Sequence, residues 1–253
     1  MASKITAQLY TIRDFVQTEE SFAASMKKLQ AIGFENVQVS GIGPINWAIV
    51  ASILKSEGLK PVITHIGLNQ LQDDIDEVIV RHQTLGCVNV AIGSIPGDYQ
   101  NYEGYLKFAE EGTEIGKKLA AVGMTFSYHN HSFEFQKFNG KTGLALIYEN
   151  SDPKYLQAEI DTYWIQHGGG DPADWIRKMK NRMPVVHFKD MLVYSDGPGM
   201  AEIGEGNLNW PRIIDACVES NVEYYAIEQD VCRRDPFESL KISFDNLKKM
   251  GVE

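Results

Sequence analysis

The chain has 253 residues, of which 43% are hydrophobic and 23% are charged, as in an ordinary globular protein. Its formal net charge of -10 argues against a nucleic-acid partner, and no apolar run reaches the roughly 18 residues that a membrane span needs. The first residues lack the pattern of a secretory signal, and the three cysteines are widely spaced, so we expect a cytoplasmic protein without disulfides.

Short β-rich runs alternate with amphipathic stretches of helical spacing from one end of the chain to the other. Eight runs are predicted as strands: Ile5–Ile12, Asn36–Ser40, Lys60–Ile66, Asn89–Gly93, Met124–His131, Leu156–Trp164, Pro184–Asp190 and Tyr224–Asp230. The stretches between and after them are predicted as helices: Ser21–Ile32, Ile45–Leu54, Gln70–Thr84, Tyr102–Val122, Gly143–Asn150, Pro172–Met183, Trp210–Ser220 and Pro236–Met250. The run Leu192–Asn209 has neither pattern and is predicted as a long irregular loop.

Eight strand–helix units in about 250 residues predict an α/β fold, a (β/α)8 TIM barrel that spans residues 1–253 as a single domain. A doubly wound sheet would also alternate strands and helices, but it usually has a glycine-rich phosphate turn after its first strand. Here the first strand leads into Tyr10-Thr11-Ile12-Arg13-Asp14, which contains no glycine. We therefore favour the barrel.

Ionisable side chains collect at the carboxyl ends of the predicted strands, where the active sites of barrels lie. The residues at these ends are His65, His129, His131, Glu159, Asp161, His187, Lys189, Glu228 and Asp230. Because strand side chains alternate between two faces, each pair two residues apart points the same way, toward the barrel axis. Carboxylates and imidazoles gathered there suit a divalent cation, either Mn, Mg, Co or Zn.

Several of these residues also have a purely structural interpretation. Glu159 is predicted to lie in a buried hydrogen-bond network rather than to act directly, and Asp190 and Asp230 would cap the loops that follow them. Of the two histidines away from strand ends, His82 is predicted on a helix surface and His167 in a loop.

Six short motifs give the chain a family resemblance over nearly its whole length. They are Tyr128-His129-Asn130-His131-Ser132-Phe133-Glu134-Phe135, Glu159-Ile160-Asp161-Thr162-Tyr163-Trp164, Gly169-Gly170-Asp171-Pro172, His187-Phe188-Lys189-Asp190, Glu202-Ile203-Gly204-Glu205-Gly206 and Ile227-Glu228-Gln229-Asp230. With these motifs the chain resembles the xylose isomerase-like TIM barrel superfamily. It is most similar to the sugar phosphate isomerase/epimerase group, alongside endonuclease IV of AP endonuclease family 2 and the inosose-processing enzymes.

The resemblance implies a divalent metal held by Glu, Asp, His and Glu from strands five to eight. Three of these ligands carry over to Asp161, His187 and Glu228. The first ligand, from strand five, departs from the family pattern, because that position holds His129 and the nearest carboxylate is Glu134. We favour Glu134 as the first ligand, with His129 as the alternative.

The resemblance also implies roles in proton transfer and substrate binding. Glu134 and Glu228 are the expected catalytic pair, with His131 as an alternative acid or base. Lys189 would help to stabilise an enediolate. The residues expected to bind substrate are His65, His129, His131, Trp164, Lys189 and Glu205.

The expected function is therefore that of a metal-dependent isomerase or epimerase of a keto-sugar or related polyol, acting by proton transfer through a metal-stabilised enediolate. One alternative is a dehydratase or lyase acting on an inosose or a 3-keto-glycoside. Two others belong to different classes: an endonuclease IV-like repair nuclease, and a non-catalytic sugar-binding barrel. The expected partner is a small carbohydrate, without nucleic acid or membrane, and the family often pairs its subunits in a homo-oligomer.

Overall fold

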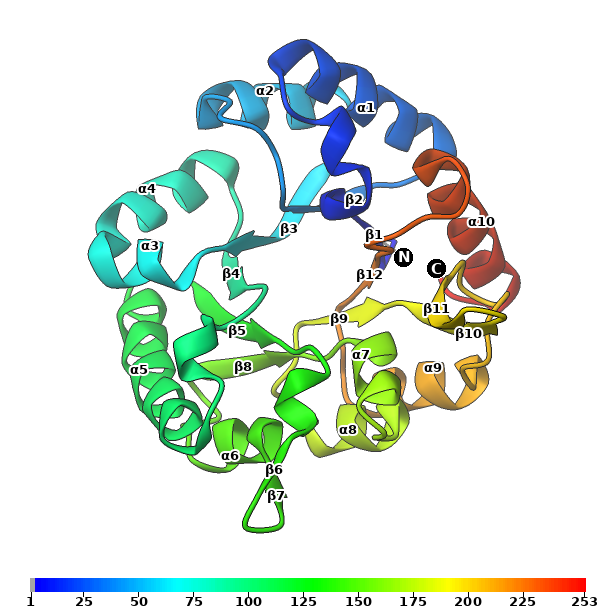
Figure 1. Cartoon of the computed structure of the whole chain (residues 1–253). Helices are drawn as coiled ribbons and strands as arrows, with labels where there is room; N and C mark the ends of the chain where they lie inside the picture. The colour runs from blue at the N-terminus through cyan, green and yellow to red at the C-terminus, as the bar shows by residue number, and fades with distance from the viewer. Residues whose placement is uncertain (1–2) are drawn as a thin grey trace.

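The computed structural model describes residues 3–253, and Figure 1 shows a ring of strands surrounded by helices. Eight parallel strands follow one another around the ring in the order β8-β5-β4-β3-β2-β1-β12-β9. Their bounds are β1 Ile5–Gln8, β2 Asn36–Val39, β3 Lys60–Ile66, β4 Asn89–Ile92, β5 Thr125–His129, β8 Leu156–Glu159, β9 Val185–Phe188 and β12 Tyr224–Ile227. A bridge between Asp161 and His187 joins the two ends of this order. The predicted TIM barrel is thereby confirmed.

Helices cover the outside of the ring, as each predicted strand–helix unit requires (Figure 1). Their bounds are α1 Glu19–Ile32, α2 Trp47–Ser56, α3 Leu68–Asp73, α4 Ile75–Leu85, α5 Tyr102–Ala120, α6 Gly143–Glu149, α7 Thr162–His167, α8 Pro172–Lys178, α9 Trp210–Glu219 and α10 Pro236–Lys249. Short 3-10 helices occur at Leu9–Phe15 (η1), Gly97–Tyr99 (η2) and Phe133–Phe135 (η3). None of the described helices combines the length and the apolar character that crossing a membrane requires.

Three predicted elements end or divide where a side chain accepts a hydrogen bond from a nearby backbone amide. Strand β1 stops at Gln8, whose Oε1 accepts the amide of Tyr10 at 3.1 Å and starts η1. The long predicted helix Gln70–Thr84 is two helices, because Asp74 caps the second of them. The predicted strand Leu156–Trp164 ends at Glu159, because Asp161 is the N-cap of α7. Local hydrogen bonds of this kind compete with the backbone hydrogen bonds that would extend a strand or helix.

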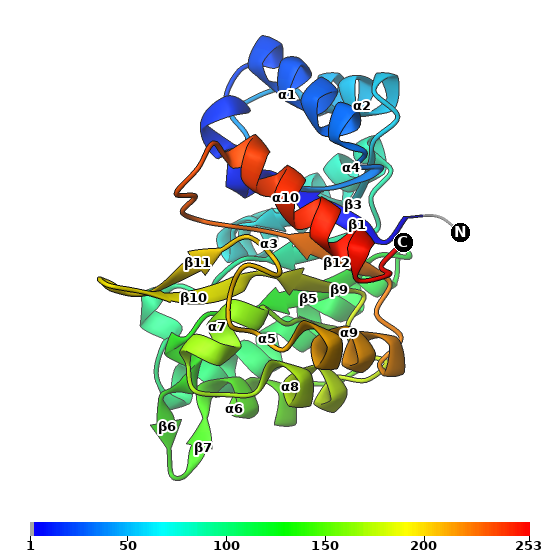
Figure 2. The same ribbon diagram turned by 90° about the vertical axis from the view of Figure 1, so that its right-hand side faces the viewer.

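The predicted irregular loop Leu192–Asn209 is partly regular. Strands β10 (Asp190–Tyr194) and β11 (Gly197–Ala201) pair as an antiparallel hairpin that turns at the glycine-containing segment between them. Figure 2 shows this hairpin extending from the end of the barrel opposite to the chain termini. A second, smaller hairpin is formed by β6 (Lys137–Phe138) and β7 (Lys141–Thr142).

The core between the strands and the helices contains one polar residue whose predicted position is wrong. His82 was expected on a helix surface, but it is fully buried on α4. Its Nδ1 lies 2.7 Å from the carbonyl oxygen of Val78 and its Nε2 lies 2.7 Å from Thr64 Oγ1. Because both ring nitrogens are paired, the imidazole is satisfied within the core.

One buried carboxylate holds the loop that follows the β10–β11 hairpin. Asp190 Oδ2 accepts the amides of Gly204 at 2.9 Å and Gly206 at 3.1 Å, and the indole Nε1 of Trp210 at 2.6 Å. Its Oδ1 accepts the amide of Leu208 at 3.2 Å. Asp190 therefore fixes the path of this loop, a larger role than the local cap that the sequence predicts.

We expect Asp190→Asn to lower the free energy of unfolding by about 2–3 kcal/mol, because the amide that replaces Oδ1 or Oδ2 cannot accept the hydrogen bonds that oxygen made. Urea unfolding followed by circular dichroism measures this change, with the exposed Asp215→Asn as the matched control. Equal stability of the two variants would contradict the role given to Asp190.

Candidate active site

Four side chains converge from four strand ends at the carboxyl end of the barrel. They are His129 at the end of β5, Asp161 after β8, His187 on β9 and Glu228 after β12. One ligand atom from each lies within 4.8 Å of all the others, and all four residues are buried. His129 Nε2 is 3.2 Å from Asp161 Oδ2, and His187 Nδ1 is 2.9 Å from Glu228 Oε2. We call these four residues the His–Asp–His–Glu cluster.

The chemistry of this cluster fits a divalent metal ion. It offers two imidazole nitrogens and two carboxylate oxygens, a mixed set that Mn, Co and Zn accept. The ring of His187 is already oriented, since its Nε2 lies 2.8 Å from Gln38 Oε1 and 3.0 Å from Glu159 Oε1. Metal-binding histidines usually have such a partner on the other nitrogen.

Glu159 is fully buried behind the cluster and connects two histidines. Its Oε1 faces His187, and its Oε2 lies 2.5 Å from His65 Nε2. Gln38 Nε2 donates to the same carboxylate at 2.9 Å. The predicted buried network around Glu159 is therefore present, and it includes His65, which was expected to bind substrate.

Lys189 provides positive charge beside the cluster. Its Nζ lies 3.1 Å from Asp161 Oδ2, 2.7 Å from Glu228 Oε2 and 3.0 Å from Asp230 Oδ2, and the lysine is 1% exposed. Burial alone would raise the pKa of Glu228, but the charges of Lys189 and His187 hold that pKa well below its usual range. The pKa of Asp161 is also lowered. Burial alone would raise it, and the charge of Lys189 is the largest of the effects that lower it.

The pKa of His187 is raised to about 10, because the charges of Glu159 and Glu228 outweigh the burial that would lower it. The folded metal-free protein thus holds this proton more tightly than the unfolded chain does. The resulting stability is complete below the ordinary histidine pKa of 6.5 and is lost as the pH rises toward about 10.

We therefore expect the free energy of unfolding, measured by urea titration in EDTA, to fall between pH 6.5 and about 10. The free energy of unfolding should also fall as the pH drops below about 4. The pKa values of Asp161 and Glu228 are lower in the folded protein than in the unfolded chain, so these carboxylates stabilise the fold only while they stay ionised. The variant His187→Gln should lack the alkaline decrease. An alkaline decrease of the same size in that variant would contradict this assignment.

Glu134, the favoured first ligand from sequence, does not join the cluster. Its carboxylate is fully buried, accepts the hydroxyl of Tyr128 at 2.5 Å and accepts the amide of His131 at 3.0 Å. Tyr128 packs outward, with its ring 4.9 Å from that of Phe108. Burial raises the pKa of Glu134 to about 7. His129, the alternative candidate, lies in the cluster instead.

The remaining predicted substrate residues divide between the cavity and the surface. His131 lines the cavity, and burial lowers its pKa to about 3, so its imidazole is neutral at pH 7. Trp164 packs against His131 with their ring centroids 5.2 Å apart. Glu205 is exposed and lies 2.8 Å from Arg234, outside the residues that line the cavity.

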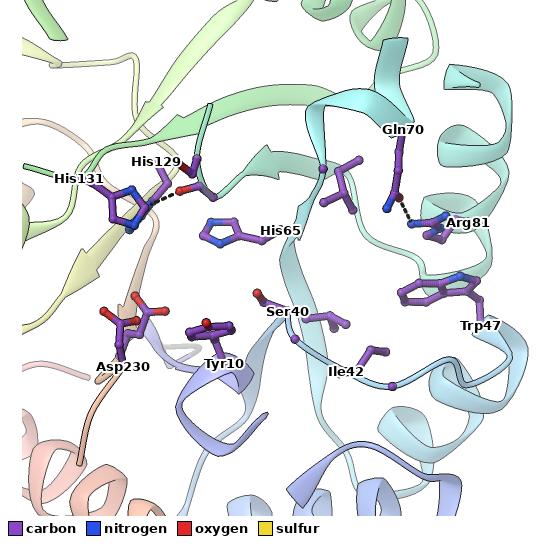
Figure 3. Close-up of a pocket in the computed structure, with 18 residues that line it drawn as sticks. Tyr10, Ser40, Ile42, Trp47, His65, Gln70, Arg81, His129, His131 and Asp230 are labelled. Atoms are coloured by element: carbon purple, nitrogen blue, oxygen red, sulfur yellow. Dashed lines mark hydrogen bonds between the residues drawn. The ribbon is translucent and has the colours of Figure 1, made fainter. Parts of the chain in front are cut away.

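A cavity of about 600 Å³ opens over the cluster (Figure 3). His129, His131, Glu228 and Asp230 line one end of it, and we call this the inner end. Other lining residues were not predicted from the sequence: Tyr10, Trp47, Gln70 and Arg81. Tyr10 follows the first strand and could have been found by the same strand-end rule, whereas the other three are on helices, where no comparable rule applies.

Comparison with known proteins agrees with this architecture. A curated inosose dehydratase of Lactiplantibacillus plantarum is 24% identical over an alignment of 156 positions that covers 54% of this chain. The chain matches about half, 51%, of the length of that relative.

Two solved structures share the fold over nearly their whole length. A sugar phosphate isomerase/epimerase from Parabacteroides distasonis has a TM-score of 0.83 at 21% identity, covering 100% of this chain and 96% of that chain. The probable 3-DHS dehydratase AsbF from Bacillus anthracis has a TM-score of 0.74 at 16% identity, covering 97% and 98%.

A family model described as "Xylose isomerase-like TIM barrel" matches residues 67–250. This span includes the last five strands of the ring and all four residues of the cluster. Together with the closed barrel, this match assigns the chain to the xylose isomerase-like TIM barrel family.

Proposed function

We propose that this protein is a divalent-metal-dependent isomerase or epimerase of a keto-sugar or related polyol. The observation that carries the proposal is the His–Asp–His–Glu cluster at the inner end of a 600 Å³ cavity. The Parabacteroides distasonis structure of the same fold is named as a sugar phosphate isomerase/epimerase. When bound, a cation at the cluster would supply Lewis acidity toward a substrate carbonyl.

The residues around the cluster support proton transfer at the carbon beside such a carbonyl. Glu228 and His131 come from the segments that follow β12 and β5, and both line the inner end. Either of them, unprotonated at pH 7, would accept the proton from the substrate carbon. A proton would then be returned, either to the neighbouring carbon by the group that accepted it or to the opposite face of the same carbon by a second, protonated group. The first outcome is isomerisation and the second is epimerisation.

Asp230 adds a third group that can exchange a proton at the inner end. It lines the cavity, and its Oδ2 lies 3.0 Å from Lys189 Nζ. Burial raises its pKa above the usual range, which Lys189 only partly offsets. A carboxyl group with a raised pKa is suited to donating a proton near neutral pH. Lys189 would stabilise negative charge that develops on the substrate oxygens.

A second candidate function is dehydration of a keto-polyol. It is favoured by the departure at strand five, where the family's glutamate is replaced by His129, so that two glutamates do not flank the site. The inosose dehydratase and the probable 3-DHS dehydratase among the relatives are named for this reaction. In that case a proton passes from the carbon beside the carbonyl to Glu228 or His131, and a hydroxyl group leaves the next carbon as water with a proton from Asp230.

The test is a screen of keto-sugars, inososes and oxidised glycosides with the Mn²⁺-loaded protein. NMR in D₂O detects both reactions: exchange or epimerisation replaces the carbon-bound proton by deuterium, and dehydration produces an alkene signal. Activity that requires Mn²⁺ and disappears in His187→Ala supports the proposal. A protein that retains no metal in elemental analysis would instead be a non-catalytic sugar-binding barrel.

A further inference from the structure

The cavity is larger than a substrate with one sugar ring requires. At a share of about 30 Å³ per water, 600 Å³ holds on the order of 20 water-sized groups, whereas a hexose has roughly 12 non-hydrogen atoms. The proposed chemistry uses only the inner end. Figure 3 shows that the cavity continues past His65 and Ser40 to Trp47, Gln70 and Arg81 on the far side. We call these last three residues the outer subsite.

The outer subsite is held together by its own contacts. The guanidinium of Arg81 lies 4.7 Å from the centroid of the Trp47 ring, and its Nη1 donates to Gln70 Oε1 at 2.8 Å. Trp47 begins α2, while Gln70 and Arg81 are on α3 and α4, so three separate helices build it. Stacking and hydrogen bonding hold the planar side-chain groups in fixed positions. A ligand that binds to them therefore loses little affinity to the cost of ordering these side chains.

The charge of the outer subsite points to a neutral occupant. Arg81 is paired with Glu77, whose Oε2 lies 2.5 Å from Nη2, so the guanidinium charge is already balanced. The two contacts of Arg81 with Gln70 and Glu77 leave other N–H groups of its five available. The amide nitrogen of Gln70 provides further donors. Hydroxyl groups can accept these hydrogen bonds without bringing a charge.

Part of the wall between the two ends is apolar and aromatic, although Ser40 and His65 also line it. Tyr10, Ile42 and Ile66 line it together with the indole of Trp47. Tyr10 is 38% exposed, and the guanidinium of Arg13 lies 4.6 Å from the centroid of its ring. Pockets that combine apolar surface with a few fixed polar groups bind and orient small organic ligands. The faces of a sugar ring are apolar and its edges carry hydroxyl groups, so it matches such a wall.

We propose that the outer subsite binds a second, uncharged sugar ring, so that the substrate is a two-ring glycoside whose reacting ring lies at the inner end. This inference rests on the proposed function for the identity of the inner ring. It adds the specificity-determining residues Trp47, Gln70 and Arg81, which lie away from the His–Asp–His–Glu cluster.

Calorimetric titration of the Mn²⁺-loaded full chain with cellobiose, maltose, methyl glucoside and glucose 6-phosphate tests this proposal. We expect one of the two disaccharides to bind at least about tenfold more tightly than methyl glucoside. Trp47→Ala and Arg81→Leu should each remove that preference and leave the affinity for methyl glucoside within about twofold. Trp47→Phe, which keeps an aromatic ring, should retain most of the preference.

Equal binding of one-ring and two-ring probes, strongest binding of the hexose phosphate, or binding of no probe would each overturn the proposal. Circular dichroism and metal content of each variant confirm that the barrel and the cluster are intact. Gln70→Ala provides a second, milder change if Arg81→Leu does not fold. A disaccharide preference without turnover or metal binding would refute the proposed function alone, and turnover without that preference would refute the subsite alone.

Discussion

Replacing Asp161 with alanine is expected to abolish divalent-metal binding while the barrel remains folded. Asp161 Oδ2 lies within 3.2 Å of His129 Nε2 and 3.8 Å of His187 Nδ1, so its oxygen is at the centre of the cluster. Removing one of four ligands and its charge lowers metal affinity by orders of magnitude. His187→Ala should have the same effect, because the imidazole offers Nδ1 toward Asp161 and Glu228.

The measurement is the metal content of dialysed protein by elemental analysis, together with circular dichroism for the fold. Glu205→Ala is the matched control, since it removes a carboxylate that is exposed and paired with Arg234. Full metal content in both Asp161→Ala and His187→Ala would show that the ion, if bound, is held elsewhere.

The same measurement decides between the two candidates for the first ligand. We expect His129→Ala to lose metal, because His129 Nε2 faces Asp161, and Glu134→Gln to retain it. Glu134 is engaged by Tyr128 and by the amide of His131, away from the cluster. The opposite result would mean that Glu134 leaves these partners when metal binds.

Replacing Lys189 with methionine is expected to have two opposite effects. In metal-free protein it leaves Asp161, Glu228 and Asp230 without their shared cation, at a cost of about 3–5 kcal/mol in the free energy of unfolding. In the presence of Mn²⁺ it should increase metal affinity by at least about tenfold, because a positive charge next to the ligand oxygens is removed. Metal should therefore restore most of the lost stability.

Urea unfolding with EDTA and with Mn²⁺, and Mn²⁺ titration by calorimetry, measure the two effects. The control is Lys141→Met, which removes a lysine from a half-exposed ion pair with Glu149 and should change neither quantity by much. Reduced stability together with unchanged or weaker metal affinity would assign to Lys189 a packing role only.

The strand-end rule accounts for what could be predicted of the site. Alternation along β9 and after β12 correctly placed His187 with Lys189 and Glu228 with Asp230 on the same side. The rule does not reach Glu134, which was proposed from the family resemblance, because its position depends on η3 turning the chain back so that the carboxylate meets Tyr128. A tertiary hydrogen bond of this kind leaves no periodic signal in the sequence.

The fold was predicted better than its boundaries. Strand β3 was predicted with the bounds Lys60–Ile66 that the structure has, because its run of β-branched residues is followed by a glycine. The β10–β11 hairpin was missed, since Ser195-Asp196-Gly197-Pro198-Gly199 is rich in turn residues although part of it pairs as a strand. Similarly, Arg81 reaches the cavity from a helix only because α4 packs beside β3 and α2, which the sequence pattern does not encode.

The closure of the ring between β8 and β9 has a consequence for how the protein opens. The backbone contacts across this seam are few: the Asp161–His187 bridge, with the amide of His187 donating to Ile160 at 2.8 Å, and the amide of Ala158 donating to Arg182 at 2.7 Å. Two residues of the cluster, Asp161 and His187, thus lie on opposite sides of the place where the ring closes. An ion that bound both residues would connect β8 and β9 directly, so metal binding should stabilise the closed ring at this place more than anywhere else.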